Sequence, residues 1–290
     1  MDICGHITVR ERLSRVAGLD VIPQSFLFSG PQQLGKFLVA LEFASRLSGT
    51  TLSEKMYHPD ILIIGRTDSE QDTDDSEKRP GLSVDQVRQA EEFLSRFPTA
   101  GKYRVVIIDQ ADRLTLSAEN ALLKVLEEPN STSIIILITH RPGKLLSTVR
   151  SRLFNVSFTP VPSIEIHRFF PGTEPPEFFF SLGLPGLVAE ARQDLARFEK
   201  RKALLRELFQ LSKLSWAKRV ALAEKLAGEP EDLVNVLEVW ISGLTRQRES
   251  QSMRSMTFVT FLESALETLD HVTEKEGNPR LLLEKLFTTA

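Results

Sequence analysis

The chain has 290 residues, and at ~150 residues per domain this length predicts two domains and room for a small third one. Its 36 basic and 39 acidic residues leave a formal charge of −3, which argues against DNA binding by bulk electrostatic attraction. Cys4 is the only cysteine, so an internal disulfide and a multi-cysteine zinc site are excluded.

Targeting and membrane signals are absent from the sequence pattern. No apolar run approaches the ~20 residues that a membrane-spanning helix needs. The segment from Met1 to Leu13 is charged and lacks the apolar stretch of a secretory signal. We therefore expect a cytoplasmic protein that has no membrane partner.

Short β-rich segments alternate with helical segments in the first half of the chain. The expected strands are Phe26–Ser29, Ile61–Ile64, Arg104–Asp109, Ile134–Thr139 and Phe154–Phe158. The expected helices are Lys36–Leu47, Val84–Arg96 and Ser117–Leu126. Three of the strands are nearly continuous apolar runs, which is typical of strands buried on both faces of a parallel sheet. The alternation predicts a layered α/β domain.

An acidic segment interrupts this alternation, and a pair of prolines ends it. Arg66–Pro80 carries six acidic side chains and is expected to be a solvated loop. After Pro160 and Pro162 the strand signal disappears. From Asp194 onwards the chain consists of amphipathic helical segments, one of which begins near Pro230. The sequence predicts an α/β domain followed by an all-helical region.

A glycine-rich segment, GPQQLGK at Gly30–Lys36, follows the first expected strand and opens a helix. This is the spacing of a phosphate-binding loop, in which backbone amides surround phosphate and the lysine contacts its outer oxygens. The next position normally supplies a hydroxyl for magnesium, but here it is Phe37. Two interpretations stay open: a nucleotide site formed by Gly30, Gly35 and Lys36, or a loop that keeps its shape for packing.

Asp109 ends the buried run Val105–Asp109, at the point where a magnesium-coordinating carboxylate projects from a parallel sheet. A hydrolytic site also needs a group that orients water, and the neighbouring Gln110 cannot act as a general base. A strand-terminal aspartate can equally cap the following turn. The sequence leaves both interpretations open.

Ser151 and Arg152 follow a short turn and precede the last expected strand. A lone arginine is usually a surface residue, although a guanidinium presented to a neighbouring subunit can neutralise charge that develops on a phosphate. The local pattern does not decide between these roles.

Metal and covalent chemistry have little support in the sequence. No nucleophile elbow of the form G-x-S-x-G occurs. None of the histidines pairs with another at metal-ligand spacing, so we expect no metal site. The histidines are His6, His58, His140, His167 and His271.

Several segments together resemble the AAA+ subunits of bacterial clamp loaders, and the most characteristic is TLSAENALLKVLEEP at Thr115–Pro129. The others are GPQQLGK at Gly30–Lys36, HPD at His58–Asp60, VVIIDQAD at Val105–Asp112 and LLSTVRSR at Leu145–Arg152. Near the end, Asn278-Pro279-Arg280 and the leucine-rich run that follows look like the last helix of an oligomerising collar. The segments stand in the family's order over almost the whole chain.

The resemblance implies an architecture of three parts. An α/β AAA+ P-loop domain with a parallel sheet would occupy residues 1–160, and a small helical lid would occupy residues 161–194. An all-α collar, which serves oligomerisation in the family, would occupy residues 195–290.

Within this family the chain looks most similar to the delta-prime type, a subunit that is typically not a motor. Phe37 replaces the magnesium-binding hydroxyl, and Gln110 replaces the catalytic glutamate. Leu187 stands where active members carry an arginine that contacts phosphate. Many relatives carry a four-cysteine zinc module before HPD, and Ser48–Tyr57 has no cysteine. The resemblance thus implies no zinc, ATP or magnesium bound by this chain.

The same resemblance assigns the site residues. The serine-arginine pair, here Ser151 and Arg152, projects in the family into a neighbouring subunit's ATP site as an arginine finger. Its usual third residue, a cysteine, is Leu153 here. The remaining positions would form a degenerate nucleotide site, in which Thr139 occupies the first sensor position. They are Gly30, Gly35, Lys36, Asp109 and Thr139.

The implied function is that of a stator, a subunit that does not hydrolyse ATP itself. It would sit in a heteromeric ring with motor and delta-type subunits of a DNA polymerase III clamp loader. The ring would place a sliding clamp on primed DNA. An ATP-hydrolysing motor subunit is the alternative, favoured by Gly30–Lys36 and Asp109 and opposed by Phe37 and Gln110. A standalone DNA-binding protein is a further alternative, which the charge balance disfavours.

Overall fold

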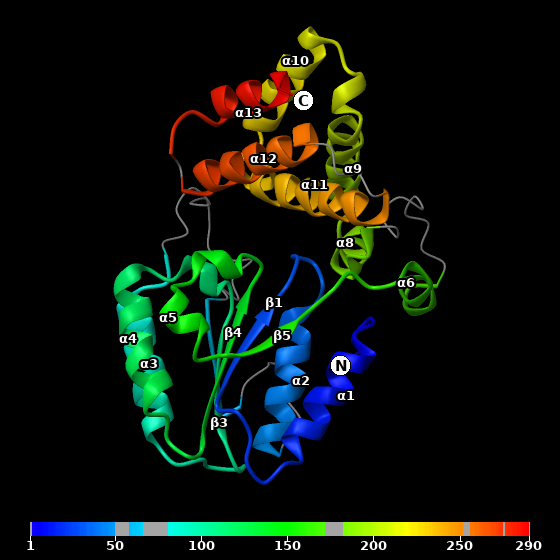
Figure 1. The fold of residues 1–290 in the computed structure, drawn as a ribbon. Helices are drawn as coiled ribbons and strands as arrows, with labels where there is room; N and C mark the ends of the chain where they lie inside the picture. Colours follow the sequence, from blue (N-terminus) through cyan, green and yellow to red (C-terminus); the bar gives the residue numbers. More distant parts are fainter. Residues whose placement is uncertain are drawn as a thin grey trace. The chain divides into compact units, whose positions relative to one another are not determined.

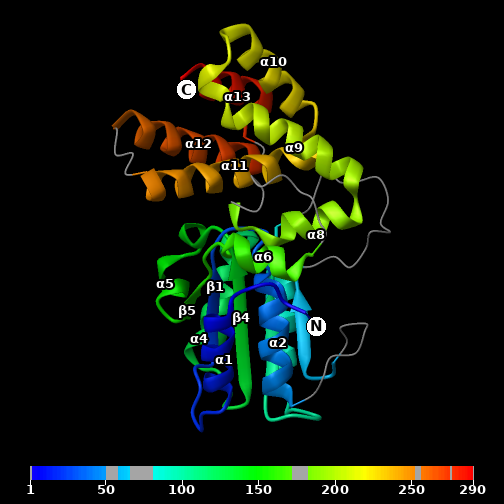
Figure 2. The same ribbon diagram turned by 90° about the vertical axis from the view of Figure 1, so that its right-hand side faces the viewer.

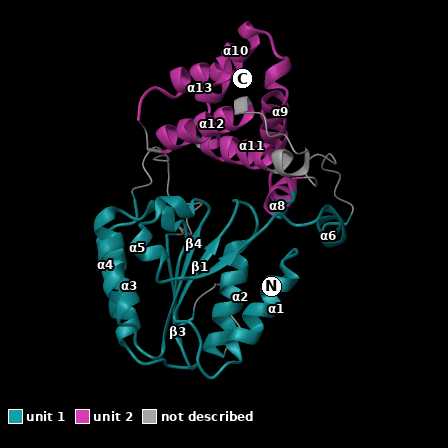
Figure 3. Ribbon diagram, in the orientation of Figure 1, with its two compact units in different colours: residues 1–171, 183–185 teal, residues 172–182, 186–290 magenta. Residues whose placement is uncertain are grey.

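The computed structural model describes residues 2–49, 58–65, 81–171, 182–251, 256–274 and 276–289. It divides into two compact units, the first made of residues 1–171 and 183–185 and the second of residues 172–182 and 186–290 (Figure 3). The boundary divides the predicted lid at 161–194 between the units, and the three-part organisation stays a prediction. The predicted acidic loop at Arg66–Pro80 lies outside the described residues.

The first unit contains a five-stranded sheet in the order β2-β3-β4-β1-β5. The strands are β1 (Ser25–Ser29), β2 (Ile61–Ile64), β3 (Arg104–Ile108), β4 (Ser133–Thr139) and β5 (Phe154–Ser157). Each neighbouring pair is parallel. The prediction of a parallel α/β sheet is confirmed, and each strand begins and ends within one residue of its expected position.

Helices cover both faces of this sheet (Figures 1 and 2). On one face lie α1 (Ile7–Ala17) and α2 (Lys36–Ser48), and on the other lie α3 (Val84–Ser95) and α4 (Leu116–Glu127). Every residue of β1, β3 and β4 is buried, which explains why these strands are apolar on both faces. The short helices α5 (Ser147–Arg150) and α6 (Ser163–Phe169) complete the unit.

Local capping residues fix where α3 and α4 begin. Ser83 and Gln86 form a reciprocal capping box at the start of α3. Thr115 accepts a hydrogen bond from the backbone N–H of Ala118 at the start of α4. Such a cap stabilises a helix by about 1 kcal/mol. Pro129 follows the end of α4 closely, as expected of a residue that cannot continue a helix.

The second unit is helical in its described part. Its helices are α8 (Pro185–Gln193, whose first residue belongs to the first unit), α9 (Leu195–Phe209), α10 (Trp216–Ala227), α11 (Pro230–Gln251), α12 (Met256–Glu274) and α13 (Pro279–Thr288). Trp240 of α11 is buried against Phe261 of α12 and Phe287 of α13, with ring centroids 5.9 and 6.1 Å away. The predicted all-helical region is confirmed.

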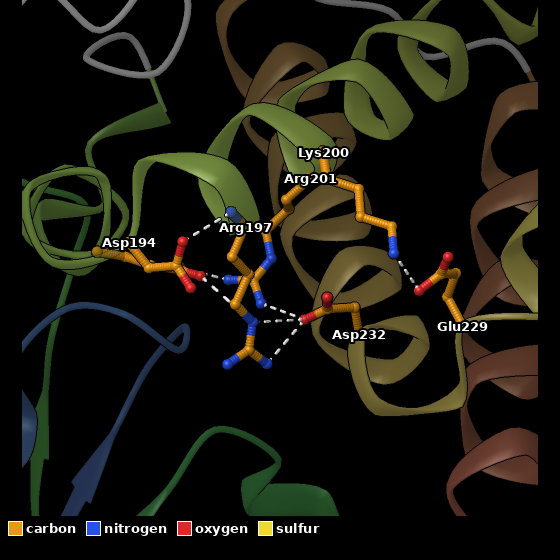
Figure 4. Close-up of polar contacts among 7 residues, drawn as sticks. Asp194, Arg197, Lys200, Arg201, Glu229 and Asp232 are labelled. Carbon is orange, nitrogen blue, oxygen red and sulfur yellow. Dashed lines mark hydrogen bonds and ion pairs between the residues drawn. The ribbon is translucent and has the colours of Figure 1, made fainter.

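A network of ion pairs ties α8, α9 and α11 together (Figure 4). Arg201, whose side chain is 3% exposed, donates to Glu190 of α8 and to Asp232 of α11. Arg197 also donates to Asp232, over 3.0 Å. The charged groups of this network are paired with one another, so we interpret it as a fastening between helices rather than as a ligand site.

No helix within the described ranges is both long and apolar enough to span a membrane.

Candidate functional site

The carboxyl ends of three adjacent strands meet at one edge of the sheet. The order β3-β4-β1 places Asp109 after β3, Thr139 at the end of β4 and the loop Gly30–Lys36 after β1. Thr139 pairs in register with Ser29, the residue before that loop. The residues predicted for a nucleotide site are therefore brought together, as ligand sites in parallel sheets usually are.

The loop Gly30–Lys36 requires glycine at its two ends for different reasons. Gly30 has a φ of +145°, and a Cβ added there would lie 2.3 Å from the carbonyl oxygen of Phe158. Gly35 has a φ of +81° and precedes α2, with no neighbouring atom closer than 4.0 Å to an added Cβ. Packing thus requires a glycine at position 30, and the left-handed backbone conformation favours one at position 35.

Lys36 is held by the loop that precedes it. Its Nζ donates to the carbonyl oxygens of Gly30 and Pro31, over 2.7 and 2.6 Å, and the residue is 7% exposed. A phosphate would have to compete with these carbonyls for the ammonium group. Phe37 is buried at the start of α2, where magnesium–ATP binding would use a hydroxyl. These residues do not fit a magnesium–ATP site.

Asp109 acts within its own turn. Its N–H donates to the carbonyl of Ile64, over 2.9 Å, which extends the pairing of β2 with β3. Its Oδ1 accepts from the N–H of Gln110, over 2.9 Å. Gln110 has a φ of +54° and accepts from Arg113 through its side chain, over 2.8 Å. The geometry supports the turn-capping interpretation, and a metal role for Asp109 stays a prediction.

Thr139 bonds to a carboxylate that the sequence analysis did not single out. Its Oγ1 donates to Oδ1 of Asp112, over 2.8 Å, and accepts from the N–H of Arg141, over 3.0 Å. Asp112 lies in the short turn after β3, and its side chain is buried. Asp112 is the last residue of the VVIIDQAD segment, and this was the one feature of the sequence that could have pointed to it. Thr139 thereby fastens the end of β4 to the turn after β3.

His140 extends this network to the glycine-rich loop. Its Nε2 accepts from Nε of Arg141, over 3.0 Å, because an arginine can only donate. The remaining ring proton is then on Nδ1, which lies 3.4 Å from Oδ1 of Asp112. The side-chain amide of Gln32, from the loop, lies 3.4 Å from Nε2. Side-chain contacts therefore bridge the loops after β1, β3 and β4.

The start of the chain covers part of the same loop. Nε2 of His6 is hydrogen-bonded to the carbonyl oxygen of Leu34, over 2.9 Å, and its ring packs edge-on against Phe158. Burial lowers the pKa of His6, which favours the neutral ring. Backbone carbonyls of the loop are thus hydrogen-bonded both by His6, which lies outside the loop, and by Lys36.

Arg152 lies apart from this network, on the turn after α5. Its Nη1 donates to the carbonyl of Thr148, over 2.8 Å, and its Nη2 donates to Oε1 of Glu127, over 2.7 Å. Oγ of Ser151 donates to the same Thr148 carbonyl, over 3.0 Å. The Arg152 side chain remains 37% exposed, so its guanidinium is held in place at the surface.

The turn that carries Arg152 is anchored to α4. Glu119 is buried on α4, and its Oε2 accepts from the N–H of Leu146, over 2.7 Å. Burial raises the pKa of Glu119. Leu145, just before the turn, and Val149, within it, are buried in the same core as Leu122 of α4. Sequence reasoning missed Glu119, although it lies within the characteristic segment Thr115–Pro129.

Leu187, at the position where the resemblance puts an arginine in active members, is completely buried in the second unit. It offers no cation to a phosphate. In the parts of the chain that the structure describes, no three His, Cys, Asp or Glu side chains lie close enough together to hold a metal ion.

A parallel sheet of this strand order, with a glycine-rich loop between β1 and α2 and with Asp109 and Thr139 beside it, defines a P-loop fold of the AAA+ clamp-loader class. A solved structure with a similar fold is a gamma subunit-related protein of DNA polymerase III from Thermotoga maritima. The two share 18% identity and a TM-score of 0.51, over 96% of this chain and 97% of that one.

Residues 5–162 match the family model described as "DNA polymerase III, delta subunit". The chain belongs to this family, the delta-prime subunits of the AAA+ clamp-loader class. This confirms the resemblance drawn from the sequence motifs.

Curated relatives agree with this assignment over about half of the chain's length. The delta-prime subunit of Pseudomonas aeruginosa is 29% identical over 153 residues, which cover 48% of this chain and 44% of that protein. The Bacillus subtilis delta-prime subunit is 32% identical over 157 residues, covering 49% and 44%. The gamma/tau subunit of Mycobacterium bovis is 30% identical over 165 residues, covering 56% and 28%. The match therefore spans less than half the length of each relative.

Proposed function

We propose that this chain is the stator of a clamp loader, a subunit that does not hydrolyse ATP and that supplies Arg152 to a neighbouring subunit's ATP site. The observation that carries the proposal is the state of Arg152. Its guanidinium is exposed at the surface and is held by two acceptors of its own chain. An arginine so presented can neutralise charge that develops on a transferring phosphate.

The chain's own loop supports the non-hydrolysing part of this proposal. The ammonium group of Lys36 is bonded to two carbonyls of the loop. Phe37 provides no hydroxyl for magnesium, and Gln110 provides no carboxylate to orient water. A subunit with these features would depend on a neighbour for nucleotide chemistry.

Family membership supports the choice of partners. We propose motor and delta-type subunits as neighbours in a heteromeric ring, with the sliding clamp and primed DNA as the complex's substrates. This assembly would act in the cytoplasm. The first unit would contribute the AAA+ interface and part of the lid, and the helical second unit would contribute the rest of the lid and the collar.

Substitution of Arg152 tests the proposal. A ring assembled from the cognate subunits with Arg152→Ala should form normally and lose roughly 10³-fold in clamp-stimulated ATP turnover. Arg152→Lys should retain only part of this ATP turnover, because an ammonium group lacks the planar fork of a guanidinium. Arg150→Ala is the matched control, since Arg150 is an exposed arginine of the same turn. Unchanged turnover in the Arg152→Ala ring would refute the proposal.

The alternative is an ATP-hydrolysing motor subunit, favoured by the proximity of Gly30–Lys36, Asp109 and Thr139 at one sheet edge. Turnover by the purified chain alone, abolished by Lys36→Ala, would establish it. Under the stator proposal the purified chain is silent, and turnover appears only after a motor subunit is added.

A further inference from the structure

Two glutamates lie at the carboxyl end of α4, where the helix dipole disfavours negative charge. Glu127 is the last helical residue and Glu128 is the C-cap, where the partial negative charge of the helix disfavours carboxylates. Glu127 is compensated by a cation from another element, Arg152, at 2.7 Å. Its position is thus explained by the pairing with Arg152 and not by the needs of α4.

The contact restrains a side chain that would otherwise be free. Arg152 has four rotatable side-chain bonds and is partly exposed, so an unpaired guanidinium would sample many positions. In the structure its Nη1 is held by Thr148 and its Nη2 by Glu127, so both ends of the planar fork are restrained. The remaining N–H groups of the guanidinium are available for an incoming acceptor.

Both ends of the arginine-bearing turn are fastened to the same helix. The buried Glu119 binds the N–H of Leu146 where the turn begins, and Glu127 binds Arg152 where it ends. The apolar side chains of Leu145, just before the turn, and of Val149, within it, are buried. The helix α4 therefore serves as a rigid support that sets the position of the guanidinium.

We infer that Glu127 is a positioning residue for Arg152 and holds its guanidinium in the orientation that meets a neighbouring subunit's phosphates. This inference rests on the proposed function. Preorganised charge stabilises a transition state without a reorganisation cost at the moment of reaction. Loss of Glu127 should therefore slow the chemical step and leave nucleotide binding by the neighbour unchanged.

The experiment measures kcat and KM for ATP in the ring assembled from the cognate subunits. Glu127→Ala should lower kcat by up to about 100-fold, the scale of effect expected of a catalytic group misplaced by roughly 1 Å, and leave KM unchanged. Glu127→Gln should recover part of the loss, because an amide oxygen still accepts from Nη2. Glu128→Ala is the matched control, as it removes an exposed carboxylate from the same helix end without touching Arg152.

The double variant Glu127→Ala with Arg152→Ala separates positioning from a structural role. If Glu127 acts through Arg152, the double variant should have the same turnover as Arg152→Ala alone. A further loss in the double variant, or a rise in kcat for Glu127→Ala, would overturn the inference. A normal Arg152→Ala ring would instead overturn the proposed function, and a normal Glu127→Ala ring beside a slow Arg152→Ala ring would overturn only the inference.

Discussion

Asp60 and Arg104 form an ion pair in the interior of the first unit, with Oδ1 of Asp60 3.4 Å from Nε of Arg104 and side-chain exposures of 0% and 8%. Asp60 also accepts the backbone N–H groups of Thr99, Ala100 and Gly101, over 2.7, 2.7 and 3.2 Å. Burial raises the pKa of Asp60, but these hydrogen bonds outweigh it and bring the pKa below its usual value. One carboxylate thereby organises the loop that precedes β3.

Removal of this carboxylate should destabilise the protein strongly. We expect Asp60→Ala to lower the free energy of unfolding by about 3 kcal/mol, because it removes the carboxylate paired with the buried Arg104 guanidinium and leaves the three backbone N–H groups that donate to Asp60 without their acceptor. Urea denaturation followed by far-UV circular dichroism measures the loss. Asp85→Ala, which removes an exposed aspartate of α3, should change little. Equal losses for the two variants would show that the buried pair has no special role.

The three glycines near the candidate site should respond differently to alanine. Gly30→Ala places a Cβ 2.3 Å from the Phe158 carbonyl and should cost roughly 3 kcal/mol. Gly35→Ala meets only backbone strain and should cost about 1 to 2 kcal/mol. Gly143→Ala meets no atom within 4 Å and serves as the control. The ranking of the denaturation midpoints checks the prediction, and a Gly30→Ala protein as stable as the control would contradict it.

The stability of the first unit should depend on the protonation of His6. Its pKa is lowered from 6.5 on folding, chiefly by burial, so the unfolded chain binds the proton more readily. The stability from the neutral ring is therefore complete above pH 6.5 and is lost as the pH falls through the lower folded pKa. Denaturation at several pH values should show this loss, and His6→Asn should show less of it. An identical pH dependence in both proteins would exclude His6 as the cause.

The buried Arg201 should be essential for the second unit (Figure 4). Arg201→Met removes the buried cation between Glu190 and Asp232, leaves them only the half-exposed Arg197, and should cost about 3 kcal/mol. Both tryptophans, Trp216 and Trp240, lie in this unit, so intrinsic fluorescence during urea denaturation reports it.

A second substitution tests the cause of that loss. Adding Glu190→Gln to Arg201→Met removes one of the two carboxylates that have lost Arg201 and keep only the half-exposed Arg197 nearby, and it should recover part of the stability. Burial raises the pKa of Glu190, so its charge is the costlier to leave unpaired. Arg197→Ala should cost far less, because Arg197 is half exposed. A double variant that is less stable than Arg201→Met alone would argue against charge as the cause.

The strands of the first unit could be predicted closely because their sequences are decisive. A buried parallel strand needs apolar residues on both faces, and an unbroken apolar run such as Ile134–Ile138 is too short to form a buried helix. The apolar spacing predicts the start of α4 within one residue, and in the structure Thr115 caps it. The clamp-loader family could be recognised from motifs that lie in these well-specified segments.

The contacts within the candidate site could not be predicted from those motifs. Thr139 and Asp112 are 27 residues apart in the chain, and their hydrogen bond depends on the adjacency of β3 and β4. The pairing of Arg152 with Glu127 spans 25 residues and depends on how α5 packs on α4. A long side chain can reach several possible hydrogen-bond partners, and the packing of the elements decides which of them it contacts.

The sequence by itself determined the alternation of strands and helices and the helical second half, because hydrophobic periodicity and capping depend on residues that are close together in the chain. It determined the family as well, because the family's motifs are short segments of sequence. It also determined which groups are missing, since Phe37, Gln110 and Leu187 cannot supply a hydroxyl, a carboxylate or a guanidinium. Only the tertiary structure decided that Lys36 binds its own loop and that Glu127 holds Arg152. Those outcomes depend on distances between elements, which the order of residues does not specify until the sheet and its helices have packed.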